Sequence, residues 1–257
     1  MKKLLNRIYS DYLMPSRLGH YEALLQAAAD AGYDQLSIRD FLRRAPAGPR
    51  APTLVHRHDI DSDVRTAAKM FALEAKNGVN ASYFFRLSTL DYGLMQEIEA
   101  YGSEASYHFE EVADFAKRHH IKDAGVLRSR FPLIRSQFRR NLLTIETRLA
   151  RKLTTVASHG DFVNRRLNVV NHEILDDAAF RARCGIDCET YDPALLRRFD
   201  LYISDLPPPR YFRPMFPAQA LGQYRCISLL THPVQWETNW SENTKCNVRR
   251  LVQALAW

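Results

Sequence analysis

TLVHRHDIDSD, residues 53–63, joins a short apolar run to a dense group of charges. Six of its last eight side chains are ionisable, and they follow directly after residues 53–55. The apolar run lies between a segment with prolines and a glycine and a helical pattern, which is typical of a buried strand. Side chains alternate along a strand, so Asp59 and Asp61 are predicted to point to one side and Ile60 to the other.

Short apolar stretches alternate with helical patterns on both sides of this strand. Strands are predicted at residues 35–38, 53–59, 81–85, 105–108, 154–158, 183–186, 201–204 and 227–230. Helices are predicted at residues 17–32, 64–75 and 91–101, in a long region interrupted near Pro132, and from about residue 247. A helical turn at 40–44 and a loop at 45–52 precede the first charged strand. This alternation predicts an α/β fold of parallel βαβ units.

About seven such units suggest a closed or nearly closed barrel. A chain of 257 residues is long enough to form a barrel of this kind as one domain. We therefore expect a single domain over residues 1–257, with a helical N-terminal extension over about residues 1–50.

The net charge of +7 is the main compositional signal for partners. Basic residues concentrate at 128–151 and 165–183, and such faces could attract nucleic acid, anionic lipid or a phosphate-bearing substrate. No nucleic-acid-binding motif accompanies them, so we expect no nucleic acid partner and favour solvated helix faces. An anionic substrate stays open.

The N-terminus begins like a signal peptide, but charged and polar residues interrupt it within residues 1–7. No apolar run approaches the length that crosses a membrane. We therefore expect a cytoplasmic protein without a transmembrane segment, for which peripheral membrane contact is open.

Polar and ionisable groups recur just after the predicted strands. They are Asp59, Asp61, Arg86, His108, Glu110, His159, Asp161, Asp205 and His232. The carboxyl ends of parallel barrel strands share one rim, where active sites are found. These groups are therefore predicted to converge there.

Two carboxylates in one enclosed site repel each other unless a cation or a proton lies between them. A metal ion held by Asp61, His108 and His159 would resolve this repulsion. The mixed nitrogen and oxygen donors favour a zinc-like ion over magnesium or calcium. Asp59 would then be free to act as a base.

A purely structural alternative for the same stretch is a strand end followed by a helix start. Ser62 and Asp63 suit that alternative, because such residues cap helices and acidic groups favour the first turn. It leaves the recurring histidines at the strand ends unexplained. His56 is predicted to pack within the strand rather than to bind a metal.

Several short motifs follow one another across about residues 20–240. They are Gly32-Tyr33, RHDID (57–61), EAKNG (74–78), SYFFR (82–86), GSEASYHFE (102–110), SHG (158–160), LYISD (201–205) and LTHP (230–233) with Trp236. This ordered set resembles the polysaccharide deacetylase superfamily, in particular its divergent branch with a His-Asp-x-Asp first motif. The resemblance implies a distorted (β/α)7 barrel in which a divalent metal, most simply Zn²⁺, serves the removal of acyl groups from N-acylated sugars.

The resemblance also implies roles for single residues. Asp59 matches the catalytic base and Asp61 a metal ligand. His108 matches the first of two ligand histidines, whereas Val112 occupies the position of the second. We expect His159 to supply the missing ligand from the next strand end.

His232 matches the late histidine that acts as general acid in the family. Arg86 or Arg165 is expected to pair with Asp59 and keep it ionised. The residues expected to contact substrate are Arg86, Glu110, Arg165 and Trp236.

The leading hypothesis is a metal-dependent N-deacetylase that acts on a nucleotide-linked or lipid-linked glycan precursor in polysaccharide or cell-surface glycan biosynthesis. One alternative is a related metal hydrolase of another C–N bond. The other is a non-catalytic carbohydrate-binding descendant, because Val112 and Ser103 replace histidines of the family.

Overall fold

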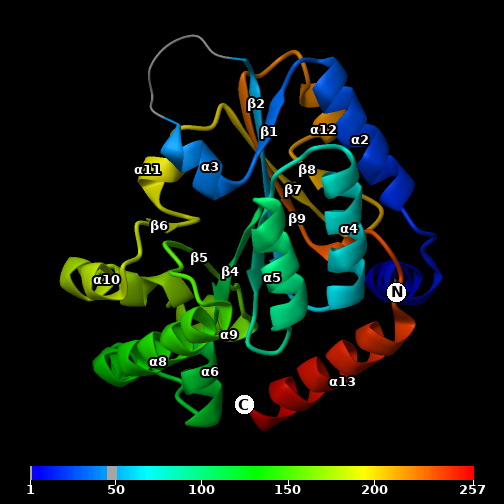
Figure 1. Cartoon of the computed structure of the whole chain (residues 1–257). Helices are drawn as coiled ribbons and strands as arrows, with labels where there is room; N and C mark the ends of the chain where they lie inside the picture. The colour runs from blue at the N-terminus through cyan, green and yellow to red at the C-terminus, as the bar shows by residue number, and fades with distance from the viewer. Residues whose placement is uncertain (1, 45–50) are drawn as a thin grey trace.

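The computed structural model describes residues 2–44 and 51–257, so residues 45–50 of the predicted loop lie outside the described part (Figure 1). The strands are β1 (Asp34–Leu36), β2 (Thr53–Ile60), β3 (Ser82–Phe85), β4 (Glu104–Phe109), β5 (Thr155–Ser158), β6 (Cys188–Glu189), β7 (Leu201–Asp205), β8 (Phe212–Arg213) and β9 (Cys226–Thr231). The α-helices are α1 (Lys2–Ile8), α2 (Leu18–Asp30), α3 (Ile38–Arg43), α4 (Val64–Lys76), α5 (Tyr92–Tyr101), α6 (Glu111–Arg118), α7 (Ala124–Ser129), α8 (Phe131–Leu149), α9 (Phe162–Leu167), α10 (Ala178–Cys184), α11 (Pro193–Leu196), α12 (Pro217–Ala220) and α13 (Trp240–Ala256). Three short helices of other types are η1 (Tyr9–Leu13), η2 (Asn171–Leu175) and η3 (Pro233–Gln235).

All strands belong to one sheet, in which eight follow the order β6-β5-β4-β3-β2-β9-β7-β8. The ninth strand, β1, pairs with the first residues of β2. Every pairing is parallel except that of β7 with β8. The predicted α/β fold of parallel units is therefore confirmed.

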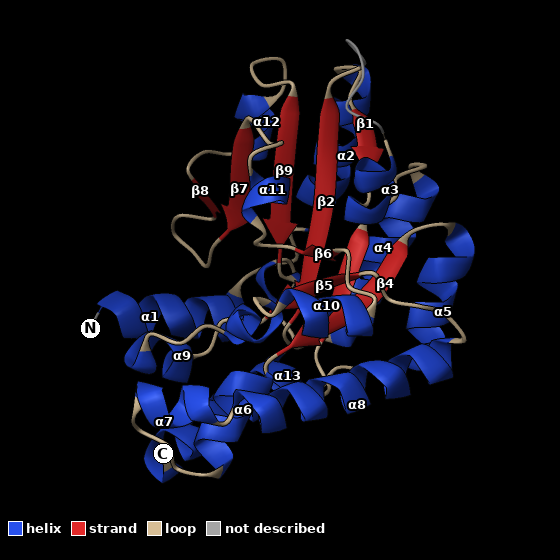
Figure 2. Cartoon of the chain, turned by 90° about the vertical axis from the view of Figure 1, so that its left-hand side faces the viewer, coloured by secondary structure: helices blue, strands red, loops and turns tan. Residues whose placement is uncertain are grey.

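The sheet curls but does not close. Figure 2 shows β2, β9 and β7 upright, while β4 and β5 run across them at a steep angle. Within the described residues the hydrogen-bonded path ends at β6 on one side and β8 on the other. Both end strands have only two residues, so they offer little backbone for a further pairing. The curled sheet is therefore compatible with the expected distorted barrel, and within the described residues it stays open between β6 and β8.

Two predicted elements are misplaced. The strand predicted at 183–186 is wrong, because α10 continues to Cys184 and ends at Gly185, whose φ of +70° is a left-handed cap. The short strand follows at residues 188–189. The last helix begins at Trp240 rather than near residue 247, with the Asn239 side chain accepting a hydrogen bond from the Glu242 N–H.

β2 is buried along almost its whole length, and its two faces contact different groups of residues. Its His58 donates a hydrogen bond of 2.7 Å to Glu74 of α4 and shares one of 2.6 Å with the Thr231 hydroxyl of β9. Tyr21 of α2 and Tyr83 of β3 both donate hydrogen bonds to the same Glu74. This fully buried polar network ties the outer side of β2 to its covering helices.

The charged stretch ends in the start of a helix, as predicted. Asp63 is the N-cap of α4 and accepts a hydrogen bond from the Thr66 N–H. His56 is fully buried and bonds to Gln35 at 3.0 Å, so it packs within the strand as predicted.

Candidate metal centre

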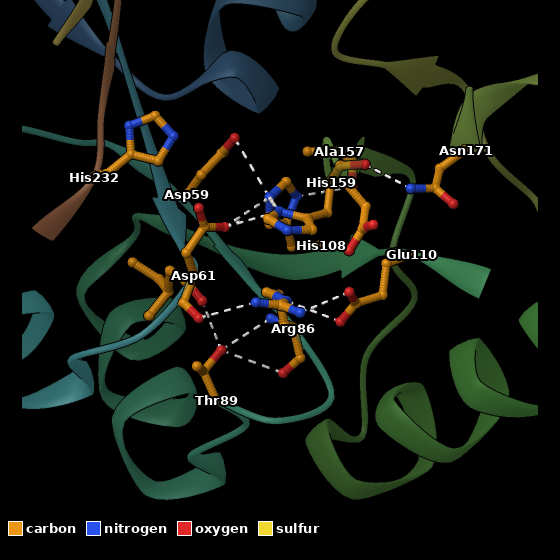
Figure 3. A network of polar contacts seen from close by, with 12 residues as sticks. Asp59, Asp61, Arg86, Thr89, His108, Glu110, Ala157, His159, Asn171 and His232 are labelled. Carbon is orange, nitrogen blue, oxygen red and sulfur yellow. Dashed lines mark hydrogen bonds and ion pairs between the residues drawn. The ribbon is translucent and has the colours of Figure 1, made fainter. Parts of the chain in front are cut away.

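Three side chains from separate strand ends meet at one point. Asp61 follows β2, His108 lies in β4, and His159 follows β5. Asp61 Oδ1 lies 2.9 Å from His159 Nδ1 and 3.3 Å from His108 Nε2. The two ring nitrogens are 3.2 Å apart. Figure 3 shows both histidines turned toward the carboxylates of Asp59 and Asp61.

These separations fit a small tetrahedral ion. Ligand atoms held about 2.0–2.1 Å from such an ion lie about 3.3 Å from one another. Asp61 Oδ1 is buried and accepts no well-aligned hydrogen bond from the described residues, despite the two nearby ring nitrogens. A buried oxygen without a donor is costly unless something else satisfies it. One carboxylate and two imidazoles therefore fit a zinc-like ion in donor type and in spacing.

The surroundings of His108 prepare it to act as a ligand. His108 is 2% exposed, and its Nδ1 lies 3.0 Å from the Ala157 carbonyl oxygen. A carbonyl can only accept, so Nδ1 carries the proton and Nε2 keeps its lone pair for the shared point. His159 is positioned through its backbone, whose N–H donates to Phe109 O and whose carbonyl accepts from Asn171.

Asp59 lies beside this group without belonging to it. Its Oδ2 is 3.5 Å from His108 Nε2. Arg57 donates two hydrogen bonds of 2.8 Å to the two oxygens of Asp59, a bidentate pair. Burial raises the pKa of Asp59, but the charge and hydrogen bonds of the Arg57 guanidinium outweigh burial and hold that pKa below its usual value. The expectation that Arg86 or Arg165 pairs with Asp59 is therefore wrong.

His232 follows β9 and has its own charged partner. Its Nδ1 donates to Asp205 Oδ1 at 2.7 Å, and its backbone N–H donates to Asp205 Oδ2. Burial lowers the pKa of His232, but the Asp205 carboxylate outweighs burial and raises it to about 9. The ring is therefore an imidazolium at neutral pH and can donate a proton.

The predicted substrate-contacting residues differ in their placement. Arg86 makes bidentate hydrogen bonds of 2.8 and 2.6 Å to Glu110, and a third of 3.2 Å to the Asp61 carbonyl. It therefore fixes the backbone of a candidate ligand as well as bordering the site. Trp236 is 1% exposed and its indole N–H donates to Asp205, so it reaches the site through that carboxylate. Arg165 is exposed on α9, and its guanidinium has no hydrogen bond or ion pair within the described chain.

Sequence reasoning missed Arg57 as a residue of this site, and it did not identify Asp205 as the partner of His232. Arg57 could have been found, because residues two apart on a strand share a face. Asp205 could not be assigned to His232, because the pairing of β7 with β9 is visible only in the folded sheet. Val112, at the position of the family's second histidine, is buried in the hydrophobic core.

Two cavities meet at Asp61. One, of about 530 Å³, is bordered by Asp61, His159 and Arg86, and the other, of about 270 Å³, by Asp61, Asp205 and His232. The candidate metal position is therefore reached from outside, as a catalytic site requires and a closed structural site does not.

Compared with known proteins, the sequence matches no protein-family model, and no curated protein matches it at a significant level. Among the described residues, no helix is both long and apolar enough to span a bilayer.

Proposed function

We propose that the protein is a metal-dependent hydrolase that removes an N-acyl group, most simply acetyl, from a sugar or glycan precursor. The observation that carries the proposal is that a candidate base and a candidate acid both lie beside the cluster of candidate metal ligands. A carboxylate held ionised, Asp59, lies 3.5 Å from His108 of the cluster. An imidazolium, His232, borders the same cavity as the ligand Asp61. The inference that the substrate is a sugar rests on the motif resemblance.

Asp61, His108 and His159 would hold the metal. A divalent ion at this position supplies Lewis acidity, which polarises an acyl carbonyl and makes water more acidic. Asp59 accepts the proton that the attacking water loses, while Arg57 keeps the carboxylate ionised and oriented. His232 donates a proton to the departing nitrogen as the C–N bond breaks. One water is consumed, and a carboxylic acid and an amine are formed.

The test is acetate release from a panel of N-acetylated sugars and sugar phosphates. Asp59→Asn should keep the bound metal and lose turnover by about 10²–10⁴-fold, because it keeps the shape of the side chain and removes the base. The matched control is Asp30→Asn, at an exposed carboxylate of α2, which should leave turnover unchanged.

Metal binding without acetate from any substrate would reject deacetylation and favour another C–N bond or a binding role. Full turnover in Asp59→Asn would reject Asp59 as the base.

A further inference from the structure

The larger cavity beside the candidate metal centre has a strongly cationic border. Figures 1 and 2 show α13 running across the end of the molecule where β2 and β9 finish. The basic residues that border this cavity are Arg65 of α4, Arg86 after β3, and Lys245, Arg249 and Arg250 of α13.

The carboxylates around the cavity are already engaged with other groups. Asp61 faces the two histidines, Asp63 accepts from Thr66 and Asn239, Asp161 pairs with Lys117, and Glu242 pairs with Lys245. Arg65, Arg249 and Arg250 are exposed and have no ion pair or hydrogen bond to their guanidinium groups within residues 2–44 and 51–257. Three positive charges at this border therefore have no counter-charge from the part of the chain that the structure describes.

The positions of these charges also indicate how a substrate would be oriented in the cavity. Arg250 borders both the larger cavity and the cavity of His232. Asp61 and His159 of the candidate metal centre border the larger cavity as well. An anionic group would therefore lie against α13, with the rest of the molecule extending toward the ligand cluster.

We infer that the substrate carries a phosphate or diphosphate group, which Arg65, Arg249 and Arg250 bind while the acyl group reaches the metal centre. This inference rests on the proposed function. Guanidinium groups match phosphate oxygens with paired hydrogen bonds and stay charged at every physiological pH. The phosphate could belong to a soluble nucleotide or to a lipid carrier, and the exposed apolar Val248, Leu251 and Val252 next to these arginines make the lipid source worth testing.

The experiment measures binding of UDP by calorimetry, and binding of phosphatidylcholine vesicles that contain a polyprenyl monophosphate by sedimentation. Neither probe carries an acyl group, so the readout does not require hydrolysis. The Arg249→Ala/Arg250→Ala double variant, and Arg65→Ala separately, should weaken binding of the preferred probe at least about tenfold, as expected when charge-assisted contacts are lost. The matched control is Arg140→Ala, at an exposed arginine of α8 that does not border the cavity.

Binding of UDP identifies a soluble phosphate source, and binding of the vesicles alone identifies a lipid-linked one. The inference is overturned if the wild-type protein binds neither probe, or if the double variant binds as tightly as the Arg140→Ala control. Acetate release without phosphate binding would reject this site and leave the proposed function standing. Phosphate binding without acetate release from any phosphorylated N-acetyl sugar would reject the proposed function alone.

Discussion

Asp59 and His232 each have a partner of opposite charge that sets their protonation state. The bidentate Arg57 keeps Asp59 anionic, and Asp205 keeps His232 cationic. Without these partners, burial would push both groups toward their neutral forms. In the proposed mechanism, the roles of Asp59 as base and His232 as acid therefore depend on two residues that need not touch substrate.

The pH dependence of turnover tests this dependence for His232. If His232 donates the proton, kcat/KM falls as pH rises through its pKa of about 9. Asp205→Asn removes the attraction that favours the imidazolium, so the alkaline fall should move to lower pH by about one unit or more. Trp236→Phe, which removes only the indole N–H that bonds to Asp205, should shift the profile less.

The measurement is kcat/KM for acetate release across pH 6–10 in the wild type and both variants. An alkaline limb at the same pH in Asp205→Asn and the wild type would show that His232 is not the proton donor.

The convergence of Asp61, His108 and His159 was predictable from sequence, whereas the partner of Asp59 was not. Asp61, His108 and His159 each end or follow an apolar strand, and strand ends of one parallel sheet meet at one edge. Arg57 shares a face with Asp59, yet an arginine is long enough to reach several carboxylates, and Arg86 was a competing partner. Only the folded chain shows that Arg86 is occupied by Glu110.

At the scale of elements, β2 links the site to the core because one face borders the site and the other packs against α4. One face presents Arg57 and Asp59 to the site, and the other places His58 against Glu74 of α4. The strand position of Asp59 therefore depends on the buried hydrogen bond between His58 and Glu74 on the opposite face.

Removing one member of a buried pair leaves the other uncompensated. Glu74→Ala should lower the free energy of unfolding by about 3–5 kcal/mol, since His58, Tyr21 and Tyr83 all lose their shared partner. The matched control is Glu22→Ala, which removes a surface ion pair between α2 and α4 and should have a much smaller effect.

Urea unfolding of the wild type and the two variants measures these differences. Equal losses in the two variants would show that the buried network does not hold β2 against its helices.

Element boundaries were predicted well where local signals were strong. The Asn77-Gly78 stop and the Asp63 start bracket α4 as expected. The strand after α10 was misplaced because the apolar Cys184 and Ile186 are two residues apart, a spacing that also suits a strand. The choice was made by tertiary packing of Phe180 and Cys184 into the core.

At the scale of the whole molecule, the curled sheet gathers the strand ends of β2, β4, β5 and β9 at one edge, and α13 lies across that edge. Strand order and closure depend on pairings between residues far apart in the chain, which periodicity does not encode. The alternation of elements therefore predicted the parallel units correctly, whereas the extent to which the sheet closes could not be predicted from it. The start of α13 depends on its Asn239 cap, and it brings Arg249 and Arg250 to the cavity.

The central claim is that Asp61, His108 and His159 bind one divalent ion. The most direct measurement is the metal content of purified protein after dialysis against zinc, for the wild type, His159→Ala and the exposed control His20→Ala. We expect about one equivalent of zinc per chain in the wild type and the control, and a loss of zinc affinity of more than about 100-fold in His159→Ala. A wild type without stoichiometric metal, or a His159→Ala variant that retains it, would contradict the account.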